Sequence, residues 1–380
     1  MKEEKKIRQS NFELMRIISM ILIIMWHLIF HGGLLETNPT KINIILELFI
    51  LIGAVHVNSF ILVTGYFQES KKINYKKVLS LIATSWFYRV FFLVIALLIG
   101  TFTISKLEIF NELLPIDMRD YWFINLYLVL YIISPYLNII VSKINQQDFK
   151  RILIGGFIIF SIIPFITNNK TIANDGYTIT NFCYLYLIGA YLKKFPIKES
   201  SYLKKYTQKK QRYLFLSIMI FFCLLNFIGY QLSKNIIGEN EIINQMAINY
   251  CASYRAFSNP FIILQTIGYF LFFSTLTIKS KVINKVSTFT LEAYLIHENF
   301  YVLNIIYDIM KTRIWYQYGG TIVIGLTLII PFLIFLLCVA VSTFRNKILQ
   351  FIKKRKTYKK IKEIGKQYLT KISKNEMIKE

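Results

Sequence analysis

The feature that most constrains this chain is a set of long apolar runs without charge. The longest, residues 319–344, reads GGTIVIGLTLIIPFLIFLLCVAVSTF and contains no charged side chain. A bilayer core about 30 Å thick is spanned by about 20 apolar residues in a helix, and only helices and closed barrels satisfy their backbone hydrogen bonds in lipid. Such runs are too long and too continuously apolar for barrel strands. The chain is therefore expected to be an all-α integral membrane protein.

Hydropathy along the chain predicts about ten transmembrane helices, in agreement with a mean hydropathy of +0.47. The expected organisation is a polytopic transmembrane domain over residues 1–344 and a basic cytoplasmic tail over residues 345–380. No small-residue cleavage site follows the first apolar run, so this run is expected to be an uncleaved anchor. The predicted spans are residues 12–32, 44–67, 78–102, 121–142, 151–167, 178–192, 213–232, 260–278, 288–310 and 319–344.

The chain is also strongly basic, with a formal net charge of +24. If the N-terminus is cytoplasmic, 35 of the 45 Lys and Arg residues fall on the cytoplasmic side, 8 fall outside, and Arg16 and Arg89 fall within spans. The positive-inside rule predicts this asymmetry, so both ends are expected in the cytoplasm. The excess charge then matches anionic membrane lipids, and no nucleic-acid partner is expected.

Several kinds of site have no motif in this sequence. The four cysteines form no CxxC and no Cys/His spacing typical of a metal site, so no metal is expected. A Gly-rich phosphate loop and a GxSxG motif are likewise not found. Function is therefore expected to lie with ionisable side chains inside the membrane, which are costly there and are functional candidates by default.

The first span carries the clearest set of such side chains. Arg16 and His27 are eleven residues apart, close to three helical turns, so they lie on one face about 16 Å apart along the axis. His31 lies one turn further along the same stripe. His27, past the midplane, is a candidate general base. Arg16 could equally extend its guanidinium to the inner headgroups.

The other two histidines fall in the second and ninth spans. His56 lies mid-span with Asn58 nearby, and His297 lies with Glu292 and Glu298. A proton relay in a transporter and a general base in a transferase would use the same types of side chain. The chemistry of these residues alone therefore leaves both classes open.

Four elements, in order, resemble the membrane acyltransferase-3 family, whose members often O-acetylate cell-surface glycans. Arg16 and His27 match the family's Arg-x10-His in the first helix. The end of the second span, Asn58-Ser-Phe-Ile-Leu-Val-Thr-Gly-Tyr-Phe, is similar to NxFxLxSGYF, with Thr in place of Ser. The others are Tyr-Trp-Phe around Trp122 and Tyr-Leu-Ile-His ending at His297. The chain looks like a Gram-positive-like member without an appended esterase-like domain.

The resemblance implies a multi-pass acyltransferase of the plasma membrane. Its co-substrate is cytoplasmic acyl-CoA, expected to be acetyl-CoA, and its acceptor is a hydroxyl of a cell-surface or lipid-linked glycan. His27 acts as general base or carries the acyl group, and Arg16 and His297 are the other expected catalytic residues. The oligomeric state stays open, with a homodimer among the options. The expected donor-binding residues are Arg16, Lys76 and Lys77, and the expected substrate-binding residues are His31, His56, Asn58, Glu292, Tyr294 and Trp122.

One stretch departs from the family pattern. Many members carry Arg-x-x-Arg before the third span, where it is implicated in acyl-CoA handling, whereas the stretch here contains Lys71, Lys72, Lys76 and Lys77. Lysine is not a bidentate phosphate ligand like arginine. Donor binding and the setting of topology explain these lysines equally well.

A polytopic transporter or glycan flippase is the alternative function, since it would use the same intramembrane His, Arg and Glu residues. Flippases usually have more spans, and many transporters show an inverted repeat, which is not evident in this sequence. A glycan polymerase would need a larger outer loop than residues 233–259, the longest one predicted.

Overall fold

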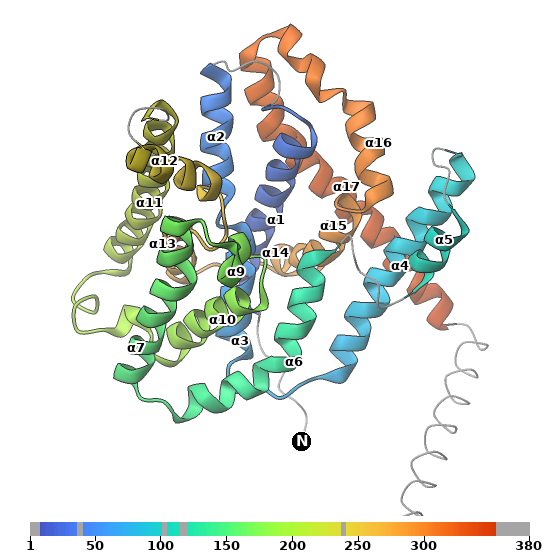
Figure 1. Cartoon of the computed structure of the whole chain (residues 1–380). Helices are drawn as coiled ribbons and strands as arrows, with labels where there is room; N and C mark the ends of the chain where they lie inside the picture. The colour runs from blue at the N-terminus through green and yellow to red at the C-terminus, as the bar shows by residue number, and fades with distance from the viewer. Residues whose placement is uncertain (1–7, 36–40, 101–104, 115–120, 237–240, 355–380) are drawn as a thin grey trace, which may run out of the picture.

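The structure, a computed structural model, describes residues 8–35, 41–100, 105–114, 121–236 and 241–354. Over these residues the chain is helical and has no β-strand (Figure 1). Seven helical stretches are long and apolar enough to cross a membrane, which confirms the all-α membrane fold. The count of about ten spans and the position of the two ends stay predictions. The seven are α1 (Ser10–His31), α2 with α3 (Lys41–Gly53, His56–Gln68), α4 (Tyr75–Ile99), α6 (Trp122–Lys143), α7 to α8 (Gln146–Phe157, Ile163–Thr167), α11 (Gln208–Ile236) and α17 (Gly320–Lys354).

Shorter helices complete the bundle. Two of them, α10 (Ile179–Lys194) and α13 (Pro260–Ser274), occupy the predicted spans 178–192 and 260–278. Both lie inside the protein, because α10 packs against α3, α6 and α7, and α13 packs against α1, α3 and α11. The others are α5 (Lys106–Leu113), α9 (Lys170–Ala173), α12 (Glu241–Ser253), α14 (Lys281–Val286), α15 (Thr290–His297) and α16 (Phe300–Met310).

Helix α1 lies at the centre of the bundle (Figure 1). It contacts α2, α3, α13, α14, α15 and α17. Its apolar side chains are buried among these helices, and Met15, Ile24 and Leu28 are at most 2% exposed. A helix that is apolar around most of its circumference is stable in such a position. Polar side chains of α1 such as Ser19 and His27 are buried in the protein as well.

Two glycines bring α3 and α10 into backbone contact. A Cβ added to Gly65 would overlap the carbonyl oxygen of Tyr186, and one added to Gly189 would overlap the carbonyl oxygen of Leu62. Small residues allow membrane helices to approach this closely. The contact gives a packing reason for the glycine that follows Thr64 in the second predicted span.

Two of the predicted spans are interrupted helices. The span predicted over residues 44–67 is divided into α2 and α3 just before His56, and the span predicted over residues 288–310 is divided into α15 and α16 just after His297. Interrupted helices occur at membrane depth where the freed backbone is buried in protein or lines a cavity. Both interruptions lie beside a histidine that was singled out from the sequence.

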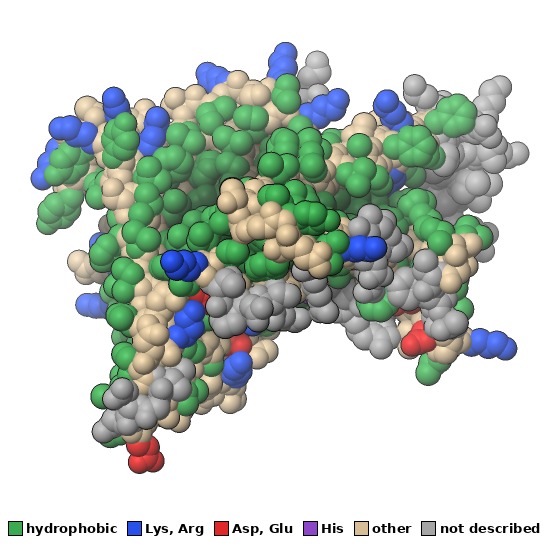
Figure 2. All heavy atoms as spheres, turned by 90° about the horizontal axis from the view of Figure 1, so that it is seen from above, with side chains coloured by type: hydrophobic (Ala, Val, Ile, Leu, Met, Phe, Trp, Pro, Cys, Tyr) green, Lys and Arg blue, Asp and Glu red, His purple; other side chains and the backbone are tan. Residues whose placement is uncertain are grey.

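Exposed apolar side chains cover the flanks of the long helices. Leu98 on α4, Phe221 on α11 and Leu337 on α17 are 81%, 59% and 62% exposed. Hydrophobic side chains are spread widely over the face shown in Figure 2. Contiguous apolar surface of this kind is typical of a protein that faces lipid.

The last helix crosses the predicted boundary between the transmembrane domain and the tail. α17 continues without interruption to Lys354, ten residues beyond the predicted boundary at residue 344. The remainder of the predicted tail, residues 355–380, lies outside the described residues.

Candidate active site

A cavity of about 1180 Å³ extends between α1, α3, α4, α6 and α15. Its lining changes along α1, from Arg8 and Arg16 at the start to His27 and His31 at the end. Because a helix rises 1.5 Å per residue, Arg16 and His27 lie about 16 Å apart along the axis. The predicted stripe on the first span therefore faces one continuous space.

His27 is in contact with two side chains from the interruption after α15. Its Nδ1 lies 3.1 Å from Nε2 of His297 in a hydrogen bond and 2.7 Å from Oε2 of Glu298 in an ion-pair contact. Nδ1 of His297 lies 2.6 Å from the carbonyl oxygen of Ala293. All three ionisable groups are at least largely buried, so their contacts are stronger than they would be in water.

These contacts assign the hydrogen on each ring. A carbonyl oxygen only accepts, so Nδ1 of His297 carries the hydrogen and its Nε2 is an acceptor. His27 Nδ1 faces that acceptor and a carboxylate oxygen, so it donates. The lone pair of neutral His27 is then on Nε2, which is the arrangement a general base requires.

Hydrogen bonds from neighbouring elements hold the interruption after α15 in place. Asn299 caps α16 by accepting a bond from the backbone N–H of Tyr301 at 3.1 Å, and its amide donates to the hydroxyl of Tyr121 at 2.9 Å. That hydroxyl donates to the carbonyl oxygen of Leu295 at 2.8 Å. Backbone groups freed at a helix end need partners of this kind. The bonds thus fix the position of Glu298 relative to α1.

The opposite end of the cavity is basic. Arg8, Lys71, Lys77 and Lys193 line it together with Arg16. The ammonium group of Lys77 lies 4.7 Å from the centre of the Tyr131 ring, and that of Lys193 lies 5.1 Å from the Tyr66 ring. Lys76 is exposed and is not among the described residues that line the cavity.

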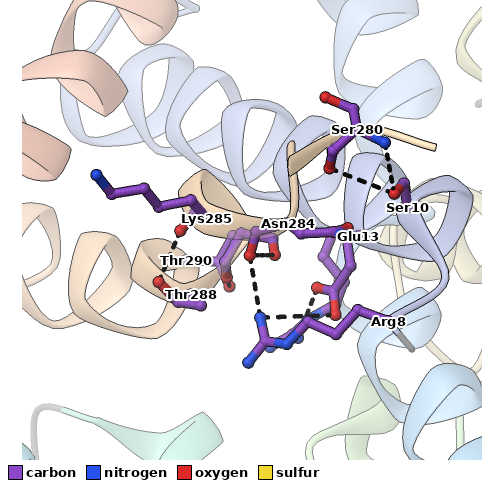
Figure 3. Close-up of polar contacts among 10 residues, drawn as sticks. Arg8, Ser10, Glu13, Ser280, Asn284, Lys285, Thr288 and Thr290 are labelled. Atoms are coloured by element: carbon purple, nitrogen blue, oxygen red, sulfur yellow. Dashed lines mark hydrogen bonds and ion pairs between the residues drawn. The ribbon is translucent and has the colours of Figure 1, made fainter. Parts of the chain in front are cut away.

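Glu13 pairs with both arginines of this basic end, and Figure 3 shows it beside Arg8. Its carboxylate is 3.2 Å from Arg16 and 3.9 Å from Arg8. Arg8 also donates to the carbonyl oxygen of Asn284 at 3.1 Å, which ties the start of α1 to α14. The Glu13 carboxylate thus holds both guanidinium groups at the cavity. An anionic ligand would offer these groups the same kind of partner.

The other predicted substrate-binding residues occupy different parts of the wall. His31 lines the cavity with Nε2 3.9 Å from Oε1 of Glu298. Tyr294 and Trp122 also line it. Glu292 lines it as well, but its carboxylate accepts from the hydroxyl of Tyr88 at 2.7 Å and pairs with Arg345 at 3.4 Å. His297 contacts Nδ1 of His27 and is not among the described residues that line the cavity.

Comparison with protein families decides the class of this protein. The family model of an acyltransferase domain, that of the acyltransferase-3 family, matches residues 9–344. The chain belongs to the acyltransferase-3 family. The predicted resemblance is thus confirmed, and the match includes all the lining residues of the cavity except Arg8. Comparisons with curated proteins and with solved structures gave no match.

The first residue of the acyltransferase-3 motif in the second predicted span contacts the segment that carries Phe257. Asn58 donates from Nδ2 to the carbonyl oxygen of Phe257 at 2.8 Å and does not itself line the cavity among the described residues. His56, only 2% exposed, does line it. Its Nδ1 accepts from the backbone N–H of Val57 at 2.7 Å.

Sequence reasoning did not assign Glu298 to the acyltransferase site. Its position next to His297 inside an apolar span could have indicated this, because two adjacent ionisable residues are costly in a membrane unless they have a function. Tyr177 and Phe257 also line the cavity and were not predicted. They come from segments between helices, where neither periodicity nor hydropathy marks a side chain as part of a wall.

The His27, His31 and Glu298 side chains also raise the question of a metal ion. Their ligand atoms lie within 4.8 Å of one another. Two ligands of a tetrahedral zinc ion are separated by about 3.3 Å, since each is about 2.0 Å from the metal. The 2.7 Å between Nδ1 of His27 and Oε2 of Glu298 is shorter than this separation.

Proposed function

We propose that this acyltransferase moves an acetyl group from cytoplasmic acetyl-CoA to a hydroxyl of a cell-surface or lipid-linked glycan. One observation carries the proposal: His27, with Nδ1 held by His297 and Glu298, shares a single cavity with a basic end about 16 Å away. In this proposal the basic end faces the cytoplasm and the membrane is the plasma membrane.

The basic end is suited to the phosphates of coenzyme A. Arg8, Arg16, Lys71, Lys77 and Lys193 supply five cations around one opening. Arginine binds phosphate through two parallel N–H groups, and lysine adds a point charge. The thin pantetheine arm then extends along α1, which brings the thioester toward His27. Lys77 is the more suitable of the two predicted lysines, because Lys76 is outside the lining.

The histidine end is suited to the transfer step. Nε2 of His27 accepts the proton of the acceptor hydroxyl while the oxygen attacks the thioester carbonyl carbon. The new C–O bond forms, the C–S bond breaks, and His27 returns the proton to the departing thiolate of coenzyme A. Glu298 stabilises the imidazolium that exists between these two proton transfers.

The transfer is tested in purified protein and in cells. The purified protein is mixed with acetyl-CoA and methyl β-D-glucopyranoside, and free coenzyme A is measured by chromatography because four free cysteines would react with thiol reagents. His27→Ala is expected to reduce release by about 10²- to 10⁴-fold, the contribution of a general base. Tyr136→Ala, which removes an exposed ring of α6, is the matched control.

The cell experiment separates a transferase from a transporter. In a His27→Ala strain, proton NMR of the surface glycan is expected to show no O-acetyl signals and an unchanged amount of glycan. Normal acetylation combined with reduced export would contradict the proposal and favour a flippase.

A further inference from the structure

Three aromatic side chains form one wall of the cavity near the histidines. The rings of Trp122 and Tyr177 have centroids 4.4 Å apart, Tyr177 and Phe257 are 5.2 Å apart, and Trp122 and Phe257 are 5.9 Å apart. All three line the cavity, and Tyr177 is 38% exposed. We call Trp122, Tyr177 and Phe257 the aromatic platform. Its exposed edge gives a ligand a route to it.

Two buried N–H groups lie beside this platform without a partner. Nε1 of Trp26 and Nε2 of His56 have no hydrogen bond to any described residue. Since Nδ1 of His56 accepts a backbone hydrogen bond, its Nε2 carries the hydrogen in the neutral ring. Both residues line the cavity, and the His56 ring is 5.4 Å from that of Phe257 and 6.0 Å from that of Trp26.

Unpaired buried donors have a cost that a ligand can remove. Leaving one without an acceptor costs about 1–3 kcal/mol. A ligand that fits here therefore carries hydrogen-bond acceptors on its edge and an apolar face for the rings. A pyranose has both, because its ring oxygen and hydroxyls surround a face of C–H groups. An alkyl chain offers no acceptor, and an acyclic polyol offers no flat C–H face.

The platform is held rigidly from several elements. The segment that carries Phe257 is fixed by Asn58 and by Ser161, whose hydroxyl donates to the Ser258 carbonyl oxygen at 2.6 Å. The backbone N–H of Phe257 donates to the Asp175 carbonyl oxygen at 2.7 Å. A preorganised surface of this kind loses less entropy when a ligand binds.

We propose that the aromatic platform, with Trp26 and His56, is the acceptor subsite and binds a neutral pyranose ring. The sugar stacks on the exposed ring of Tyr177, which is tilted by 58° to that of Trp122, and the two N–H groups donate to its oxygens. The proposal rests on the proposed function for the identity of the site as an acyl-acceptor site, but sugar binding itself needs no acyl donor.

Binding is therefore tested without acetyl-CoA. Saturation-transfer NMR is recorded on the full chain in lipid nanodiscs with methyl β-D-glucopyranoside as the probe. Alkyl-glycoside detergents must be removed, because their head groups would occupy the subsite. The expected result is saturation of H1, H3 and H5, the protons of one ring face. Tyr177→Ala is expected to reduce the signal at least fivefold, and Trp26→Phe, which removes the indole N–H and keeps a smaller aromatic ring, to weaken binding about threefold to tenfold.

The controls make the outcome decisive. Tyr136→Ala on the same helix as Trp122 should retain the signal, and D-sorbitol should give none. Equal signals from sorbitol, or an unchanged signal in Tyr177→Ala, would overturn the subsite. Acetyl transfer to a surface glycan without pyranoside binding would overturn the subsite and leave the proposed function standing. Pyranoside binding without any release of coenzyme A would support the subsite and overturn the proposed function.

Discussion

Glu298 is the side chain that assists His27 in the proposed mechanism. Its carboxylate contacts Nδ1 of His27 and is only 14% exposed, so it stabilises positive charge on that ring in a poorly hydrated site. Glu298→Gln is expected to lower kcat about 10- to 100-fold and to leave the acetyl-CoA KM unchanged, because the carboxylate acts on the imidazolium that forms during transfer. Glu298→Asp should restore part of kcat.

Steady-state kinetics of coenzyme A release measures this split. Asp148→Asn is the control, since it neutralises an exposed carboxylate that does not line the cavity. A rise in KM with constant kcat in Glu298→Gln would indicate a role in donor binding instead.

Glu13 gives a second prediction for a single side chain. Its carboxylate pairs with the guanidinium groups of Arg8 and Arg16, which are proposed to bind phosphate, and its negative charge repels the phosphates. Glu13→Gln is therefore expected to lower the acetyl-CoA KM about threefold to fivefold, with a smaller effect at high salt. Initial rates at two ionic strengths test this.

The chain offers a matched control for Glu13. Asp148 pairs with Arg151 at the same spacing of three residues on exposed α7, away from the cavity. Asp148→Asn should leave the KM unchanged. A higher KM in Glu13→Gln would mean that the carboxylate orients the arginines rather than competing for them.

The spacing of residues along one helix explains which site residues could be predicted from the sequence. Arg16 and His27 share one helix, so their spacing alone places them on one face, and both line the cavity. His297 and Glu298 reach His27 at the interruption where α15 ends at His297 and α16 begins at Phe300. Neither that interruption nor the contribution of Tyr177 is encoded in a periodic pattern. The catalytic and binding roles of all these residues stay predictions.

At the scale of elements, the crossing of α3 and α10 is a contact that is sensitive to added volume. Gly65→Ala would place a methyl group on the Tyr186 carbonyl oxygen. The variant is expected to lose about 1–3 kcal/mol of stability, the usual cost of overpacking. Thermal unfolding in nanodiscs, followed by circular dichroism, measures the loss.

Gly155→Ala is the control for this element, because a Cβ added there meets no atom within 4 Å. Alanine is the better helix former, so this variant should unfold at the same temperature or slightly higher. Equal behaviour of the two variants would show that α3 and α10 separate at little cost.

Helix existence was predictable from hydropathy, whereas helix continuity was not. Residues 12–32 became one buried helix, as expected. The predicted spans 44–67 and 288–310 are both interrupted. The polar partners that make an interruption tolerable, such as Tyr121 for Asn299, are distant in sequence and are brought together only by packing.

At the scale of the whole molecule, the uneven distribution of Lys and Arg predicts its orientation. Lys209 is exposed at the start of α11 and Glu241 is exposed at the start of α12. In a Cys251→Ser background, a membrane-impermeant maleimide is expected to label Glu241→Cys in intact cells. Lys209→Cys should react only after the cells are opened. The reverse pattern would invert the topology and place the basic end of the cavity outside.

The depth of the cavity has an electrical consequence. In the proposed orientation, water that fills the basic end continues the cytoplasm inward along α1 toward His27. The membrane voltage then falls mainly across the thinner layer of protein beyond the histidines. Moving one elementary charge through 100 mV requires about 2.3 kcal/mol. Charge formed on His27 would therefore be near the cytoplasmic potential, so a residue deep in the bilayer can take up and release protons at little electrical cost.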